Sequence, residues 1–214
     1  MFRSLRKMLS PAAAIRTPEA HAMKLLHIDS SILGPNSVSR ALSADIVARQ
    51  VALRPGTELI YRDLASDTAL HLTGAHLAAR QGTPIEDAAL RKDVACGDVY
   101  IDDLFAADII VIGTPMYNFS IPSQLKAWID RVVVAGKTFR YGANGAPESL
   151  LPKGKKIYIA SSRGGVYAPG SPAAALEHHE SYLIGVLAFI GLRCHRRSRR
   201  GYCARPRRAR RGDC

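Results

Sequence analysis

Short apolar runs alternate along the chain with stretches of helical spacing. Four of the runs have the length of a β-strand, and they cover residues 24–29, 57–64, 108–113 and 155–160. The third run, DIIVIG, has no polar alternation, which is typical of a central parallel strand covered on both faces. The stretches between the runs predict helices over residues 39–54, 73–81, 84–105, 122–134 and 171–190. This order of elements predicts an α/β domain with a parallel sheet.

Two of the predicted helices have a recognisable apolar side. In helix 39–54 this side consists of Ala41, Leu42, Ile46 and Val47, and in helix 122–134 of Leu125, Trp128, Ile129, Val132 and Val133. Residues 138–145 end in Asn144-Gly145, a dipeptide that favours a hairpin turn. A complete doubly wound domain of this size usually has about five strands. We expect the missing strand to begin just after Leu192.

The two ends of the chain carry all of its excess charge. The formal net charge is +12, of which residues 1–22 contribute +3 and residues 193–214, with ten arginines, contribute +9. Residues 23–192 hold 16 basic and 16 acidic side chains. We therefore interpret residues 23–192 as one neutral globular domain of ordinary size.

The terminal segments do not have the pattern of a folded domain. We expect residues 1–22 to be a disordered extension or a misassigned start, with synthesis beginning at Met23, although their arginine-rich composition also resembles a transit peptide. Residues 193–214 have no apolar periodicity. Such a segment can bind nucleic acid by counterion release. We favour a disordered tail or an out-of-frame reading of a GC-rich gene, and expect no nucleic-acid binding by it.

Cysteine usage and hydropathy narrow the class of protein. Cys96 is the only cysteine of residues 23–192, and the chain has no Cys-x-x-Cys pair. This pattern favours a reducing, cytoplasmic location and predicts no metal site. The apolar runs are shorter than the roughly 20 residues of a membrane-spanning helix, so we expect no membrane partner.

The loops after the first, third and fourth strands carry the candidate chemistry, because ligands of open parallel sheets bind beyond the carboxyl ends of the strands. The first loop, SSILGPNSVS at 30–39, is rich in hydroxyls, holds no Lys or Arg, and leads into a helix. Its N–H groups and the hydroxyls of Ser31, Ser37 and Ser39 can surround a phosphate, helped by the helix dipole. The alternative is that Ser37 or Ser39 only caps the helix.

The other two loops are suited to a flat ring. The second loop, GTPMYNFSIP at 113–122, can provide aromatic walls and backbone donors, unless its aromatics only cap the core. The third loop, SSRGGVY at 161–167, has paired glycines that allow close backbone approach and N–H donation to a carbonyl or a developing anion, unless it is a plain flexible loop. Three such loops at successive strand ends favour one shared ligand site.

Residues 23–192 resemble the FMN-dependent NADH:quinone oxidoreductase and azoreductase family. The motifs that carry the resemblance are SSILGPNSVS at 30–39, GTPMYNFSIPSQLKAWID at 113–130, GKTFRYGANG at 136–145 and SSRGG at 161–165. The resemblance implies a flavodoxin-like three-layer sandwich, here expected to lack the fifth strand and last helix, and a homodimer. It also implies reduction of quinones and aromatic azo compounds with NADH as electron donor.

The resemblance also implies a set of FMN-binding residues. Those around the phosphate are Ser31, Ser37, Val38 and Ser39. Those around the isoalloxazine are Met116, Tyr117, Asn118, Phe119, Ser162, Arg163, Gly164 and Gly165. No Gly-x-Gly-x-x-Gly follows a strand, so NADH and the oxidant would use one site in turn. No side chain is assigned a catalytic role, and the proton for azo cleavage can come from Tyr167, water or the flavin.

The histidines predict no further site. We interpret His27, inside a strand, as structural, and His178-His179 as a solvated or interface pair. His71 and His76 have no convergent partner in the pattern. Other functions remain open: an NADPH-dependent reductase of FMN or other flavins, a truncated inactive copy, an electron carrier, which the neutral domain disfavours, or a nucleic-acid-binding scaffold.

Overall fold

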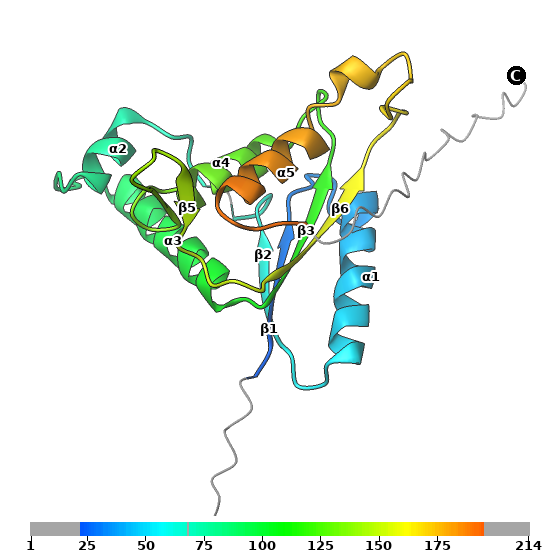
Figure 1. Cartoon of the computed structure of the whole chain (residues 1–214), viewed down its shortest axis with the longest axis horizontal. Helices are drawn as coiled ribbons and strands as arrows, with labels where there is room; N and C mark the ends of the chain where they lie inside the picture. Colours follow the sequence, from blue (N-terminus) through cyan, green and yellow to red (C-terminus); the bar gives the residue numbers. More distant parts are fainter. Residues whose placement is uncertain (1–21, 68, 195–214) are drawn as a thin grey trace, which may run out of the picture.

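A parallel sheet of four strands lies at the centre of the fold (Figure 1). In the computed structural model, which describes residues 22–67 and 69–194, the strand order is β2-β1-β3-β6. The bounds are Lys24–Asp29 for β1, Glu58–Asp63 for β2, Ile109–Pro115 for β3 and Lys156–Ser162 for β6. All three ladders between these strands are parallel. The four predicted strands and their parallel pairing are therefore confirmed.

Helices cover both faces of the sheet and give three layers (Figure 1). α1, Val38–Leu53, packs on one face against β1, β3 and β6. The other face is covered by α3, Ala88–Ala106, α4, Ser123–Val132, and α5, Glu180–Phe189. The remaining elements are α2, Gly74–Arg80, the 3-10 turns η1, Gly34–Asn36, and η2, Ala174–Leu176, and the antiparallel hairpin of β4, Phe139–Tyr141, and β5, Pro147–Ser149. This hairpin confirms the predicted turn.

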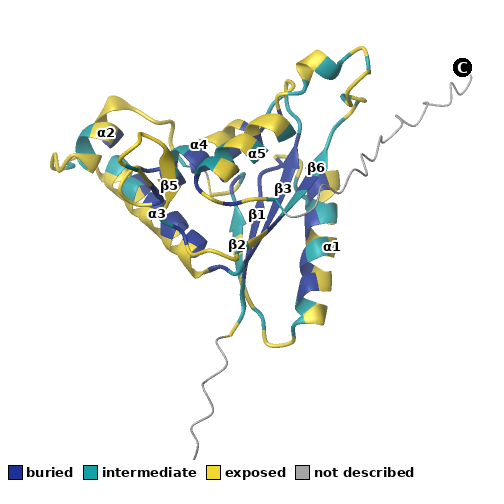
Figure 2. Ribbon diagram, in the orientation of Figure 1, coloured by how far each residue is buried: buried dark blue, intermediate teal, exposed yellow. Residues whose placement is uncertain are grey.

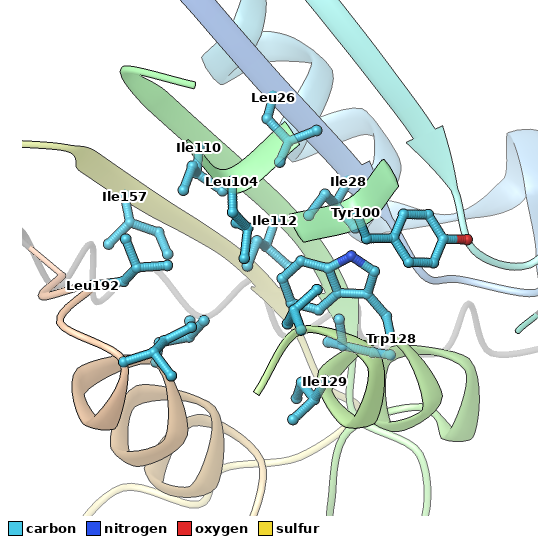
Figure 3. Packing of buried hydrophobic residues seen from close by; sticks show 14 of the residues in the cluster. Leu26, Ile28, Tyr100, Leu104, Ile110, Ile112, Trp128, Ile129, Ile157 and Leu192 are labelled. Atoms are coloured by element: carbon cyan, nitrogen blue, oxygen red, sulfur yellow. The ribbon is translucent and has the colours of Figure 1, made fainter. Parts of the chain in front are cut away.

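The main core lies between the sheet and the layer of α3, α4 and α5 (Figure 2). Every residue of β3 is buried, as its unbroken apolar run predicts. Trp128 of α4 and Tyr100 of α3 pack with Ile28 and Ile112 from the sheet (Figure 3). The predicted inward side of α4 is confirmed, although Val133 is only half-buried.

α1 faces the sheet largely with polar residues. Its buried residues are Ser39, Ser43, Val47 and Gln50. Of the predicted apolar side, Val47 is buried and Ile46 packs against the same core cluster, whereas Ala41 is exposed and Leu42 is half-buried, so that prediction is confirmed only in part. The reason is the close approach of α1 to the sheet. Ser43 Oγ donates to the buried carboxylate of Asp29 at 2.7 Å, and a Cβ on Gly113 would collide with both side chains.

Two helices begin later than predicted, because capping rather than periodicity sets their first turn. α3 begins at Ala88 rather than at 84, and the carboxylate of Asp87 accepts from the N–H of Leu90 at 2.7 Å. α5 begins at Glu180 rather than at 171, and the carboxylate of Glu177 accepts from the N–H of Glu180 at 2.7 Å. Burial tends to raise the pKa of Glu177, but the backbone hydrogen bonds outweigh burial and hold this pKa below its ordinary value.

A buried polar cluster joins α2, α3 and α4. His76 Nε2 lies 3.0 Å from Asp93 Oδ2, and Arg131 Nε donates to the same oxygen at 2.6 Å. The exposed fractions of the three residues lie between 3% and 7%. The prediction that His76 has no convergent partner is therefore wrong. Its partners come from other helices, 17 and 55 residues away in sequence, which a local pattern does not reveal.

β6 lies at the edge of the sheet where the missing strand was expected. Within residues 22–67 and 69–194 the central sheet has four strands, and Cys194 forms an isolated parallel bridge with Ile157 of β6. The chain after α5 therefore returns to this edge. The predictions for residues 1–21 and for the arginine-rich residues 195–214 concern parts of the chain outside the described residues. No helix in the described part is long and apolar enough to cross a membrane.

Truncating a side chain of β3 tests the placement of the core. Ile112→Ala removes a side chain with 0% exposure, and the free energy of unfolding should fall by about 2–5 kcal/mol. Leu59→Ala is the control, because Leu59 in β2 is 49% exposed, and it should cost less than about 1 kcal/mol. Urea denaturation measures both losses, and equal losses would contradict the observed burial.

Candidate functional site

The three loops leave the sheet at the same edge. β1, β3 and β6 are neighbours in parallel register, with Asp29 opposite Gly113 and Pro115 opposite Ser162. The carboxyl ends of these strands therefore face one side of the molecule (Figure 1). This arrangement places the first, second and third loops next to one another, as the order of elements predicts.

Hydrogen bonds join the second loop to both of its neighbours. The Tyr117 hydroxyl lies 3.2 Å from Ser31 Oγ and accepts from the N–H of Ile32 at 3.3 Å. On the other side, the N–H of Met116 donates to the carbonyl oxygen of Ser162 at 2.7 Å. Residues from all three loops are thus in direct contact.

The first loop places three buried hydroxyls near the start of α1. Ser31, Ser37 and Ser39 are all less than 5% exposed, whereas Val38 is exposed. Ser37 Oγ accepts from the N–H of Arg40 at 3.3 Å and lies 3.0 Å from Ser39 Oγ. Ser37 therefore caps α1, which is the alternative that the sequence left open. The loop still combines neutral donors with the positive end of the α1 dipole.

Arg40 lies behind the first loop, one residue beyond the segment that lacks a cation. Its Nε and Nη2 donate to the carbonyl oxygen of Ser31 at 3.2 and 2.8 Å. Nη1 and Nη2 also donate to the carboxylate of Asp63 at 2.9 and 2.6 Å. Burial tends to raise the pKa of Asp63, but its hydrogen bonds, led by that from Arg40, outweigh burial and lower this pKa. Arg40 therefore holds the loop to the end of β2.

Sequence reasoning missed Arg40 because its partner Asp63 lies 23 residues away. The only local signal was a cation in the first turn of the helix that follows a hydroxyl-rich loop.

The second loop contains a tight turn with a strained backbone. Tyr117 and Ser120 exchange two backbone hydrogen bonds of 3.0 Å, and Asn118 and Phe119 between them have φ of +47° and +70°. The left-handed conformation costs roughly 1–2 kcal/mol for residues other than Gly. It keeps the Phe119 ring 43% exposed, so this aromatic does not cap the core. The ring meets Tyr167 of the third loop edge to face, with centroids 6.2 Å apart.

The third loop is held by α5. Arg163 forms an ion pair with Glu180, and Ser161 Oγ donates to the same carboxylate oxygen at 2.6 Å. A Cβ on Gly164 would meet nothing within 4 Å, whereas a Cβ on Gly165 would lie 3.2 Å from the Tyr167 ring. The space beside Gly164 is therefore open, and only Gly165 is crowded.

A groove of about 820 Å³ opens beside the second loop. This volume is within the range of about 300–1,000 Å³ that is common for ligand pockets. Among the predicted site residues, Met116, Tyr117 and Asn118 line the groove, together with Ile32 and residues of α4 and α5. The groove therefore joins the second loop to the α4 side, and the predicted residues of the first and third loops are not among those that line it.

Comparison with known proteins places the chain in a family. The sequence model of a family described by its flavodoxin-like fold matches residues 23–196. The chain belongs to this family. Curated proteins named FMN-dependent NADH:quinone oxidoreductase are 55% identical to it in Bradyrhizobium sp., 56% in Methylorubrum extorquens and 57% in Sinorhizobium fredii. Each alignment spans 170 residues, 79% of this chain and 81–83% of the relative.

Solved structures agree with the flavodoxin-like assignment. An azoreductase from Bacillus anthracis str. Sterne aligns with a TM-score of 0.69 and 30% identity, over 79% of this chain and 82% of that one. An FMN-dependent NADH-azoreductase from Bacillus anthracis str. Ames Ancestor, solved in complex with FMN, shares the fold with a TM-score of 0.70 at 24% identity, over the same shares. The resemblance carried by the sequence motifs is therefore confirmed.

The start of α5 places a buried histidine beside the site of this flavodoxin-like protein. His179 is 0% exposed, and its Nε2 lies 3.0 Å from Thr114 Oγ1 at the end of β3. Burial lowers the pKa of His179 to about 4, so the ring is neutral at pH 7. The expectation of a solvated or interface pair agrees with exposed His178 and is wrong for His179.

The low pKa of His179 makes part of the folding stability depend on pH. An unfolded histidine titrates near pH 6.5, so below that pH the unfolded state binds a proton that the folded state excludes. The free energy of unfolding is therefore highest above pH 6.5 and falls as the pH drops towards 4, by about 2–3 kcal/mol for this residue.

In His179→Gln this contribution to the pH dependence should vanish. Urea denaturation of both proteins at pH 7 and pH 5 measures the difference. Parallel losses of stability in the two proteins would contradict the assignment.

Proposed function

We propose that the chain is an FMN-dependent oxidoreductase that takes electrons from NADH and reduces quinones and aromatic azo compounds. One observation carries the proposal. The loops that follow β1, β3 and β6 meet at one edge of the sheet, and hydrogen bonds join the second of these loops to the other two. The names of the relatives, FMN-dependent NADH:quinone oxidoreductase and azoreductase, support the same activity.

The donor set at the start of α1 fits a phosphate. Buried hydroxyls of Ser31, Ser37 and Ser39 gather beside the positive end of the helix. The charge of Arg40 is already paired with Asp63, so attraction for the phosphate rests on neutral donors and the helix dipole. We assign these three serines, with the backbone of Val38, to the phosphate of FMN.

The second and third loops fit a flat ring system. Residues 116–119 supply an exposed aromatic side chain and a fixed turn, and residues 162–165 supply open space beside Gly164. We assign both segments to the isoalloxazine. FMN supplies the electron-transfer chemistry when bound, and the protein orients the ring and excludes water. The Tyr117 hydroxyl, which contacts Ser31, links the phosphate half of the proposed site to the ring half.

We propose that residues 23–192 are the functional domain and act as a homodimer in the cytoplasm. Each of the three loops exposes an apolar side chain: Ile32 is 60% exposed, Phe119 43% and Val166 60%. Exposed apolar groups of this kind favour a partner surface. The isolated Cys96 fits a reducing compartment.

Light scattering tests the dimer. The parent protein should have twice the 23.2 kDa mass of one chain. Val166→Glu should shift it towards the monomer, because a charge would be buried at the interface. Val99→Glu, on an exposed side chain of α3, is the control and should leave the mass unchanged. A monomeric parent protein would rule the dimer out.

An absorbance titration tests the activity. The purified protein should bind FMN, its flavin absorbance should bleach on anaerobic addition of NADH, and a quinone should restore it. Ser39→Ala should weaken FMN binding by roughly tenfold or more, because Ser39 donates to the phosphate but is not the acceptor that caps α1. Thr83→Ala, at an exposed loop position away from the site, should bind FMN like the parent.

Two results would count against the function. One is a protein that takes up no FMN, and the other is a flavin that NADH leaves oxidised.

A further inference from the structure

The residues at the start of α5 hold the second and third loops together. We call residues 177–180 the α5 clamp. The N–H of His178 donates to the carbonyl oxygen of Phe119 at 3.1 Å, and Ser120 Oγ donates to the carbonyl oxygen of His178 at 3.3 Å. Glu180 binds Ser161 and Arg163 of the third loop. One short segment therefore contacts both loops that we assign to the flavin ring.

The charged contact of the α5 clamp involves the only cation of the third loop. Among residues 161–167, Arg163 alone carries a positive charge, and its side chain is 16% exposed. The Glu180 carboxylate that pairs with it is 37% exposed. Ser161 Oγ also lies within 3.3 Å of Arg163 Nη2, so the guanidinium is held from two sides. The guanidinium of Arg163 is therefore fixed in position and its charge is neutralised. The third loop is left to contact a ligand through its backbone.

We propose that Glu180 is a positioning residue that sets the electrostatic preference of the site for oxidised over reduced flavin. The proposal rests on the function proposed above. Reduced FMN carries more negative charge on its ring than oxidised FMN, so an unpaired cation in the third loop would favour the reduced form. Glu180 neutralises Arg163 and holds its guanidinium against α5. In this way Glu180 limits the preference of the site for reduced flavin. The bound flavin therefore stays able to reduce a quinone.

Glu180→Gln keeps an oxygen that can accept from Ser161 but removes the charge that balances Arg163. The ratio of the dissociation constants of oxidised and reduced FMN should then rise by roughly three- to tenfold, the effect of one unbalanced and partly screened charge. A tenfold change corresponds to a rise of about 30 mV in the two-electron midpoint potential.

Two further variants separate electrostatics from folding. Glu148→Gln is the matched control, because it removes the same charge from an exposed ion pair with an arginine, Arg140, in the β4–β5 hairpin. It should leave the potential close to that of the parent. Arg163→Met removes the cation itself, so the unbalanced charge of Glu180 should lower the potential, and Glu180→Gln added to it should bring the potential back towards that of the parent.

Each FMN-loaded protein is equilibrated with a reference dye during anaerobic reduction, which measures the midpoint potential of the bound flavin. Fluorescence quenching measures the affinity for oxidised FMN. A rise in Glu180→Gln that Glu148→Gln lacks, together with a higher potential in the double variant than in Arg163→Met, supports the proposal. Should Glu180→Gln fail to fold, a lower potential in Arg163→Met than in the parent supports it. Unchanged potentials in variants that bind FMN overturn it. A parent protein that binds no FMN overturns the proposed function as well.

Discussion

The buried carboxylate of Asp29 joins the elements from which the site is built. It lies at the carboxyl end of β1 and is 3% exposed. Ser43 Oγ from α1 donates to it at 2.7 Å, and the Tyr61 hydroxyl from β2 donates to it at 3.2 Å. Gly113 of β3 passes so close that a Cβ would collide with the carboxylate. A buried carboxylate without partners costs several kcal/mol. The contacts to Asp29 therefore fix the distances between β1, α1, β2 and β3 directly below the first loop.

The two faces of the sheet make different contributions. On the side of α3, α4 and α5, Trp128 and its apolar neighbours supply most of the burial. On the side of α1, serines allow a helix N-terminus to approach the strand ends. Arg40, behind the first loop, and Arg163, in the third loop, are each paired with a carboxylate. The proposed ligand site therefore relies on neutral donors on a stable scaffold, which suits a cofactor whose charge changes during the reaction.

The sequence predicts well the features that depend on residues close together in the chain. The unbroken run of β3, the strand–helix alternation and the loops after the strands all depend on neighbouring residues, and the structure has each of them. The polar face of α1 was not predicted, because it depends on Gly113 and Asp29 in other strands. His179 and Glu180 were missed for the same reason, since their partners lie 65 and 17 or more residues away. Residues 171–179 look helical by composition, but the Glu177 cap starts α5 later.

Amide hydrogen exchange with and without FMN tests the central claim, that three loops form one cofactor site. The account predicts that FMN slows exchange together in peptides covering residues 31–39, 116–119 and 162–165, while the exposed loop between α2 and α3 exchanges as before. Protection confined to one of the three segments, or spread evenly over the whole chain, would contradict it.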